Sequence, residues 1–176
     1  LEAESESGIC KVICYHPNHS LTLPLMEVGD IIEVINLWQK EYTSLGSDQN
    51  INHVQIFENK GAIMGCSNPH PHGQIWAQRS IPQEVEKKVV RQKSYWDKNN
   101  SSLLGDYLKQ ERNAKERIVL ENESFVALVP YWAVWPFEAM IVPKRHITSI
   151  LELSQQEVSD YASILKALTI KYDNLF

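Results

Sequence analysis

The fold of this chain is decided around one stretch, Gly65-Cys66-Ser67-Asn68-Pro69-His70-Pro71-His72-Gly73-Gln74-Ile75. It sets two histidines one residue apart, in a turn of small residues and prolines that leads into an apolar segment. In extended backbone, residues i and i+2 share a face, so His70 and His72 can point into one pocket and Gln74 can follow on the same side. The glycines and prolines indicate a backbone of fixed shape that comes close to a neighbouring group. The pattern predicts a turn that binds an anionic group and in which a histidine side chain takes part in the chemistry.

Strands and helices are predicted on both sides of this turn. Apolar alternation predicts strands, and apolar spacing of three and four predicts helices. The block 83–117 is rich in charge, with Glu84 and Lys88 four apart, and predicts a solvated helix. The other predicted strands are 10–15, 52–58, 75–77, 118–129 and 137–142, and the other predicted helices are 27–45 and 155–174. This mixture indicates an α+β fold.

A weak internal repeat relates the two ends of the chain. Residues 13–19 and 140–146 each combine a strand, a proline turn and a histidine. An apolar stretch and a helix that opens with Glu-Val-x-Asp follow each copy, at 27–30 and 157–160. Only the first copy continues to His-Pro-His. We therefore expect residues 1–117 to be the later part of one α+β unit and residues 118–176 to be the front part of its duplicate, with the chain truncated at both ends.

Composition narrows the class of protein. Hydrophobic content of 43% and charged content of 22% are typical of a globular chain. The net charge of −5 argues against a nucleic-acid partner, and no 18-residue apolar run predicts a membrane span. Three cysteines without disulfide-like spacing suggest reduced thiols and a cytoplasmic protein. Two of them, Cys10 and Cys14, are predicted to pack in the core.

The residues of the turn suit phosphoryl chemistry. A neutral imidazole is a good nucleophile at pH 7, and a covalent intermediate splits one difficult displacement into two easier ones. Backbone N–H groups at Gly65 and Cys66 and the Ser67 hydroxyl could stabilise phosphate oxygens. Gln74 adds an amide donor but cannot supply a proton, which suits group transfer better than acid-assisted hydrolysis.

Two other interpretations of the histidines stay open from the residues alone. Imidazole is a common zinc ligand, and His19 and His70 could supply two of the four ligands that a structural zinc site needs, with the others outside this chain. In the plainest interpretation, His70 and His72 are ordinary turn or core residues.

Three stretches carry a family resemblance. Asn59-Lys60-Gly61 followed by the run 65–76 closely resembles the galactose-1-phosphate uridylyltransferases, a branch of the histidine-triad superfamily. The stretches 18–24 and 129–138 resemble the same family. The resemblance covers nearly the whole chain. It implies duplicated histidine-triad-like halves, each a mostly antiparallel sheet with packed helices.

The resemblance also implies a ping-pong reaction. His72 would attack the α-phosphorus of UDP-glucose to form a uridylyl-histidine, and galactose 1-phosphate would then accept the uridylyl group. The His70 carbonyl could orient the His72 ring. The resemblance implies a homodimer as well. The residues that would contact the nucleotide-sugar phosphates are Asn59, Gly65, Cys66, Ser67 and Gln74.

For metals, the resemblance implies zinc on His19 and His70. The remaining zinc ligands of the family, a cysteine pair, lie N-terminal to anything in this chain. Many members also place a Glu of the following helix in a second metal site, often iron. Lys88 stands at that position here, and an ammonium cannot ligate a metal, so the sequence argues against the second site.

Other activities compete with uridylyl transfer. One alternative is a nucleotide-sugar phosphorylase or a dinucleoside polyphosphate hydrolase of the same superfamily, and another is a zinc- and nucleotide-binding module without turnover. Gln74 argues against the hydrolase, which usually has a third histidine there, but it does not exclude the phosphorylase. His72 argues against the module without turnover.

Overall fold

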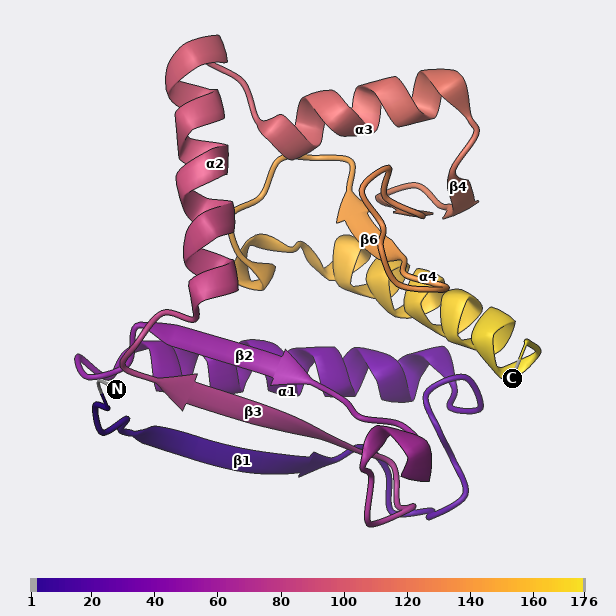
Figure 1. Ribbon diagram of the computed structural model, residues 1–176. Coiled ribbons are helices and arrows are strands. Elements are labelled where there is room, and N and C mark those ends of the chain that lie inside the picture. Colours follow the sequence, from indigo (N-terminus) through magenta and orange to yellow (C-terminus); the bar gives the residue numbers. More distant parts are fainter. Residues whose placement is uncertain (1–2, 176) are drawn as a thin grey trace. The chain divides into compact units, whose positions relative to one another are not determined.

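The computed structural model describes residues 3–175, and the chain divides into two compact units, one up to Glu86 and one from Lys87 onward. Within the described residues there are two antiparallel three-stranded sheets and four α-helices, which confirms the α+β class (Figure 1). The division at residue 117, predicted from the repeat, stays a prediction.

The sheet of the first unit has β3 (His72–Gln78) in its centre, with β1 (Gly8–Cys14) and β2 (His53–Phe57) on either side. Both pairings are antiparallel. The register sets Cys14 opposite His72 and Phe57 opposite Gln74. The second histidine of the His-Pro-His turn is therefore the first residue of the central strand.

Helix α1 (Val28–Gly46) covers one face of this sheet (Figure 1). Its buried residues recur at helical spacing and give it one apolar side; they are Ile31, Val34, Ile35 and Leu45. On β3, Gly73, Ile75 and Ala77 are buried. Because side chains alternate along a strand, His72, Gln74 and Trp76 lie on the opposite face, which we call the open face.

The alternation of β1 corrects one prediction. Cys10 and Cys14 are exposed rather than in the core. They share a face with Val12, which is 67% exposed, whereas Ile13 between them is buried. The sequence suggested core thiols because cysteine is often buried, but their position in the strand places them on the open face.

In the second unit, β5 (Phe125–Leu128) is the central strand between β4 (Ile118–Glu121) and β6 (Met140–Pro143). All four β5 residues are buried. Val126 and Leu128 pack in one cluster with Leu108 of α3 (Leu103–Ala114). On the other face, Phe125 contacts Tyr161 of α4 (Gln155–Asp173), with ring centroids 5.3 Å apart. Helices cover both faces, which explains the continuous apolar run.

Two predicted elements are each divided in the structure. The block 83–117 forms α2 (Gln83–Asn99) and α3, separated where Asn100 has a φ of 51° and Ser102 caps α3. The predicted strand 118–129 forms β4 and β5 around an Asn122 turn, in which the Asn122 side chain accepts hydrogen bonds from two backbone N–H groups. Asparagine favours such turns because its side chain mimics a backbone acceptor. α2 has no buried residue, as expected of a solvated helix.

The predicted repeat has a structural counterpart. β1 and α1 form a strand, a turn and a 19-residue helix, and β6 and α4 form another. A short 3₁₀ turn (Ile150–Glu152) precedes α4, and another (Ala62–Met64) lies between β2 and β3. α4 begins with a capping box of Ser154 and Glu157, whereas α1 follows Glu27 without a side-chain cap. No helix within residues 3–175 has the length and apolarity to cross a bilayer.

Candidate functional site

A cavity of about 390 Å³ lies where the loop 58–71 runs into β3. Five of the residues singled out from the sequence line it: Asn59, Cys66, Ser67, His70 and His72. Gly65 and Gln74 do not line it. Gly65 ends the short 3₁₀ turn beside the cavity, and Gln74 lies on the open face of β3, two residues along from His72.

The ring of His72 is held by its own turn. Its Nδ1 lies 2.7 Å from the carbonyl oxygen of His70. A carbonyl can only accept, so Nδ1 carries the proton of the neutral ring and Nε2 keeps its lone pair. The local geometry therefore prepares Nε2 as the nucleophilic atom, and only the backbone of His70 is needed for this.

The backbone around His70 is fixed by short-range hydrogen bonds. The N–H of His70 donates to Oδ1 of Asn68 over 3.0 Å, and the Cys66 thiol donates to the Asn68 carbonyl over 3.0 Å. Gly65 begins this loop with a φ of +82°, a conformation that favours glycine. Sequence reasoning missed this role of Asn68. Its position before Pro69 was a usable signal, because Asn-Pro favours the start of a turn.

The side chains of His70 and His19 meet. Their Nδ1 atoms are 2.7 Å apart, and the two rings are nearly perpendicular. In the loop that carries His19, the backbone N–H of Asn18 donates to His16 Nδ1 over 2.9 Å. At this distance one nitrogen of the His19–His70 pair donates a hydrogen bond to the other, and two imidazole nitrogens brought together in this way are candidate ligands of one metal ion. Residues 3–175 contain no cluster of three or more His, Cys, Asp or Glu arranged to bind a metal, so this pair is at most a partial site.

An apolar group of side chains follows His72 on the open face. Trp76 is 50% exposed, and its ring meets the ring of Phe57 edge to face at 5.3 Å. Val12 of β1 lies opposite Gln74 on the same face. Sequence reasoning gave no role to either aromatic residue. The period-two spacing of Trp76 from His72 and Gln74 was a usable signal, whereas Phe57 joins this face only through the pairing of β2 with β3. The face can contact a flat apolar group next to the nucleophile.

The second unit contains a separate cavity of about 280 Å³ beside residues 142–150. Its cations are paired: Lys144 contacts Glu121 at 2.7 Å and Arg145 contacts Glu157 at 2.9 Å. His146 stacks on Trp96 with ring centroids 6.1 Å apart. His146 thus packs on an aromatic ring of its own unit.

Comparison with family models matches the chain in two parts. Residues 1–82 match "Galactose-1-phosphate uridyl transferase, N-terminal domain", and residues 86–176 match "Galactose-1-phosphate uridyl transferase, C-terminal domain". The boundary between the two matches lies close to the one between the compact units.

Similar curated proteins carry the same name. A galactose-1-phosphate uridylyltransferase of Haemophilus influenzae is 52% identical over 99% of this chain and 50% of its own length. One of Saccharomyces cerevisiae is 49% identical over 100% of this chain and 50% of its own. The chain thus spans about half the length of the curated relatives it matches.

Solved structures are similar over nine-tenths of the chain. A uridylyltransferase structure has a TM-score of 0.86 at 30% identity, over 90% of this chain and 51% of that one. An ADP-glucose phosphorylase of Arabidopsis thaliana, solved with ADP-glucose, has a TM-score of 0.82 at 26% identity, over 92% of this chain and 50% of that one.

Proposed function

The chain belongs to the galactose-1-phosphate uridyl transferase family, and on that premise we propose that it carries the nucleophile of a uridylyl transfer from UDP-glucose to galactose 1-phosphate. The observation that carries the proposal is the hydrogen bond from His72 Nδ1 to the His70 carbonyl, which leaves Nε2 as the free lone pair at the cavity. A turn or core histidine would not require this arrangement beside Ser67 and Asn59.

In the first step, Nε2 of His72 attacks the α-phosphorus of UDP-glucose. A P–N bond forms, the P–O bond to the β-phosphate breaks, and glucose 1-phosphate leaves. The leaving group is a phosphate monoester whose second pKa is about 6, so it departs at pH 7 without a proton from the enzyme. A glutamine at position 74 is compatible with this step, because no general acid is needed.

In the second step, a phosphate oxygen of galactose 1-phosphate attacks the same phosphorus. The P–N bond breaks, UDP-galactose forms, and the electron pair returns to His72 Nε2. Both steps pass through charge on the phosphorus oxygens, which N–H and hydroxyl donors stabilise when they are already in place. Asn59, Cys66 and Ser67 line the cavity for this role, and Gly65 and Gln74 complete the proposed contact set.

We assign His19 and His70 to a structural zinc ion. Zinc would tie the loop of His19 to the turn of His70 and so support the backbone that orients His72. The residues present fit two ligands, and the other two would come from residues beyond those described. Lys88 is exposed on α2, and our proposal includes no second metal there.

The likeness to an ADP-glucose phosphorylase supports a second candidate. In that reaction the same nucleophile would take an adenylyl group and inorganic phosphate would accept it. Curated relatives named as uridylyltransferases are 44–52% identical. Among the solved structures a uridylyltransferase is 30% identical, against 26% for the phosphorylase, and both comparisons favour the first candidate.

We further propose that the complete natural protein is a cytoplasmic homodimer. The three free cysteines suit a reducing compartment, and the family resemblance supports the dimer. Light scattering on the complete protein tests the oligomeric state, and a monomer at micromolar concentration would exclude the dimer.

The test of the reaction is the intact mass of the complete natural protein after mixing with UDP-glucose. We expect one uridylyl adduct per chain in the wild type, none in His72→Ala, and an undiminished adduct in His146→Ala, which alters a histidine that does not line the cavity. Galactose 1-phosphate should discharge the adduct to UDP-galactose.

Two outcomes would redirect the assignment. An adduct formed from ADP-glucose and discharged by inorganic phosphate, with none from UDP-glucose, would favour the phosphorylase. Binding of UDP-glucose without any adduct would reject nucleophilic catalysis and leave a binding module.

A further inference from the structure

We infer that Tyr15 is a positioning residue for His72, and that the absence of a side chain at Gly73 is what allows it to act. The inference rests on the proposed function only for its kinetic readout. Tyr15 follows the last residue of β1, is 8% exposed and lies on the buried face of the sheet, opposite to His72. It would act through the backbone on both sides of the nucleophile.

The first contact is with the residue before His72. The backbone N–H of Tyr15 donates to the carbonyl of Pro71 over 3.0 Å. This bond continues the β1–β3 ladder one residue beyond the pair of Cys14 and His72. The peptide group between Pro71 and His72 is therefore hydrogen-bonded to the residue that follows β1. The carbonyl of His70 remains available to the His72 ring.

The second contact is with the residue after His72. A Cβ placed on Gly73 would lie 3.0 Å from Cζ and 3.1 Å from Cε1 of Tyr15, and its closest contact would be the Tyr15 hydroxyl oxygen. The contact with the hydroxyl oxygen would be shorter than side-chain carbons tolerate, and the two contacts with ring carbons would be tight, so the end of the Tyr15 side chain occupies the space that any other residue would need. Gly73 has no positive φ, so this close approach, and not backbone conformation, accounts for the glycine.

The ring of Tyr15 has little freedom to move away. It meets Trp38 of α1 edge to face, with ring centroids 6.3 Å apart and an interplanar angle of 70°. A buried aromatic ring held between a helix and a strand resists displacement, because interiors are close-packed. An added methyl group at residue 73 would therefore move the strand rather than the ring.

A shift of β3 at residue 73 would displace the functional side chains next to it. His72 and Gln74 are its direct neighbours on the open face. Relieving the contacts with Tyr15 requires a movement on the order of 1 Å, and a misplacement of that size can cost about 100-fold in rate. Binding of UDP-glucose should suffer far less, because it is spread over many contacts.

The test uses the complete natural protein and four variants. Gly73→Ala should slow formation of the uridylyl-histidine by about 100-fold, while KM for UDP-glucose changes by less than about threefold. Gly29→Ala is the matched control, because nothing lies within 4 Å of a Cβ added there, and it should react at the wild-type rate. Gly73→Ala/Tyr15→Leu, which makes room for the methyl group, should recover at least about tenfold of the lost rate. Tyr15→Leu alone should be slowed by about tenfold.

A rate for Gly73→Ala within threefold of the wild type would overturn the inference. So would a double variant whose loss equals the product of the two single losses, since independent sites add in free energy. If Gly73→Ala fails to fold, Tyr15→Leu with wild-type Gly73 still decides the matter, and an unchanged rate in that folded variant would reject the role of Tyr15.

A readout without turnover separates this inference from the proposed function. The ¹⁵N NMR shifts of the His72 ring report which nitrogen carries the proton. We expect a protonated Nδ1 in the wild type and a mixture of tautomers in Gly73→Ala, because the bond to the His70 carbonyl is disturbed. Wild-type protein that forms no adduct would reject the proposed reaction alone. A tautomer unchanged in Gly73→Ala would reject the positioning role alone.

Discussion

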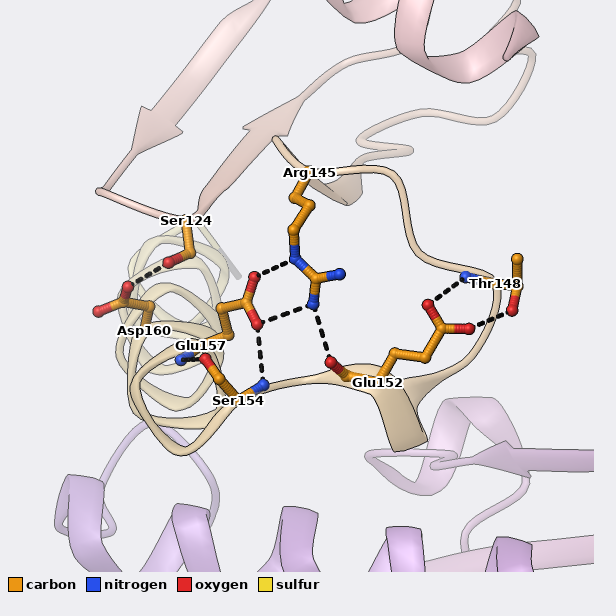
Figure 2. A network of polar contacts seen from close by, with 7 residues as sticks. All are labelled: Ser124, Arg145, Thr148, Glu152, Ser154, Glu157 and Asp160. Atoms are coloured by element: carbon orange, nitrogen blue, oxygen red, sulfur yellow. Dashed lines mark hydrogen bonds and ion pairs between the residues drawn. The ribbon is translucent and has the colours of Figure 1, made fainter. Parts of the chain in front are cut away.

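Glu157 receives three hydrogen bonds at the start of α4, and its replacement by Gln should destabilise the second unit in a pH-dependent way. Arg145 donates to its two carboxylate oxygens over 2.9 and 3.0 Å, and the backbone N–H of Ser154 donates over 2.8 Å (Figure 2). Arg145 first, and the Ser154 amide next, lower the pKa of Glu157 from its ordinary 4.5 to about 2.

The size of the effect follows from that pKa. The drop from 4.5 to about 2 corresponds to at most about 3.4 kcal/mol of stability. The Glu157 side chain is 14% exposed, but the Arg145 side chain is 50% exposed, and solvent weakens such a pair. We therefore expect Glu157→Gln to lower the free energy of unfolding by about 1–2 kcal/mol at pH 7.

The direction of the pH dependence is fixed by the sign of the shift. A carboxyl group with a lowered folded-state pKa stabilises fully above its unfolded pKa of 4.5 and loses that stabilisation as the pH falls through 2. At pH 3 about two-fifths of the stabilisation should remain. The difference in free energy of unfolding between wild type and Glu157→Gln should fall to the same fraction of its value at pH 7.

Urea unfolding of this 176-residue chain at pH 7 and pH 3, with hydrogen exchange of α4 peptides as the local readout, measures both quantities. Glu27→Gln is the matched control, because Glu27 precedes the other 19-residue helix and makes no side-chain cap bond. It should change stability by less than about 0.5 kcal/mol. An equal loss for Glu157→Gln at both pH values, or no loss at pH 7, would refute the reasoning.

Two further predictions concern a buried charge and the metal. Arg117→Met should destabilise the chain by about 3 kcal/mol in urea unfolding, because it removes the Nε–H group that bonds both carboxylate oxygens of Glu111, whose side chain is only 2% exposed. Arg112→Met removes a more exposed ion pair and should cost under about 1 kcal/mol. Equal losses in the two variants would contradict this reasoning. In the complete protein, His19→Ala should lower the zinc content per chain while His146→Ala leaves it unchanged, and elemental analysis that finds no difference would reject the zinc assignment.

Much of the fold could be predicted because its signals are local. The spacing of Ile31, Val34 and Ile35 is sufficient for α1, and the Ser154 capping box marks the start of α4. The same holds for the turn of the candidate site. Its glycines, prolines and histidines are neighbours in sequence, so their arrangement around His72 depends mainly on short-range geometry.

The features that escaped sequence reasoning depend on partners distant in the chain. The exposure of Cys14 follows from the register with β3, which places it opposite His72. The contact of Tyr15 with Gly73 joins residues 58 positions apart, and no local pattern reports it. The break before α3 was missed because the charge pattern continues across Asn100, where the backbone turns.

The seven residues of β3, the central strand of the first unit, supply side chains both to the hydrophobic core and to the candidate site. Because β3 alternates, Gly73, Ile75 and Ala77 belong to the core, and His72, Gln74 and Trp76 belong to the open face. A substitution on the open face should change the rate with little effect on stability. A substitution on the core face should change both, since the packing that stabilises the unit also sets the position of the nucleophile. The two classes of variant are separable by comparing the rate of adduct formation with the free energy of unfolding along this one strand.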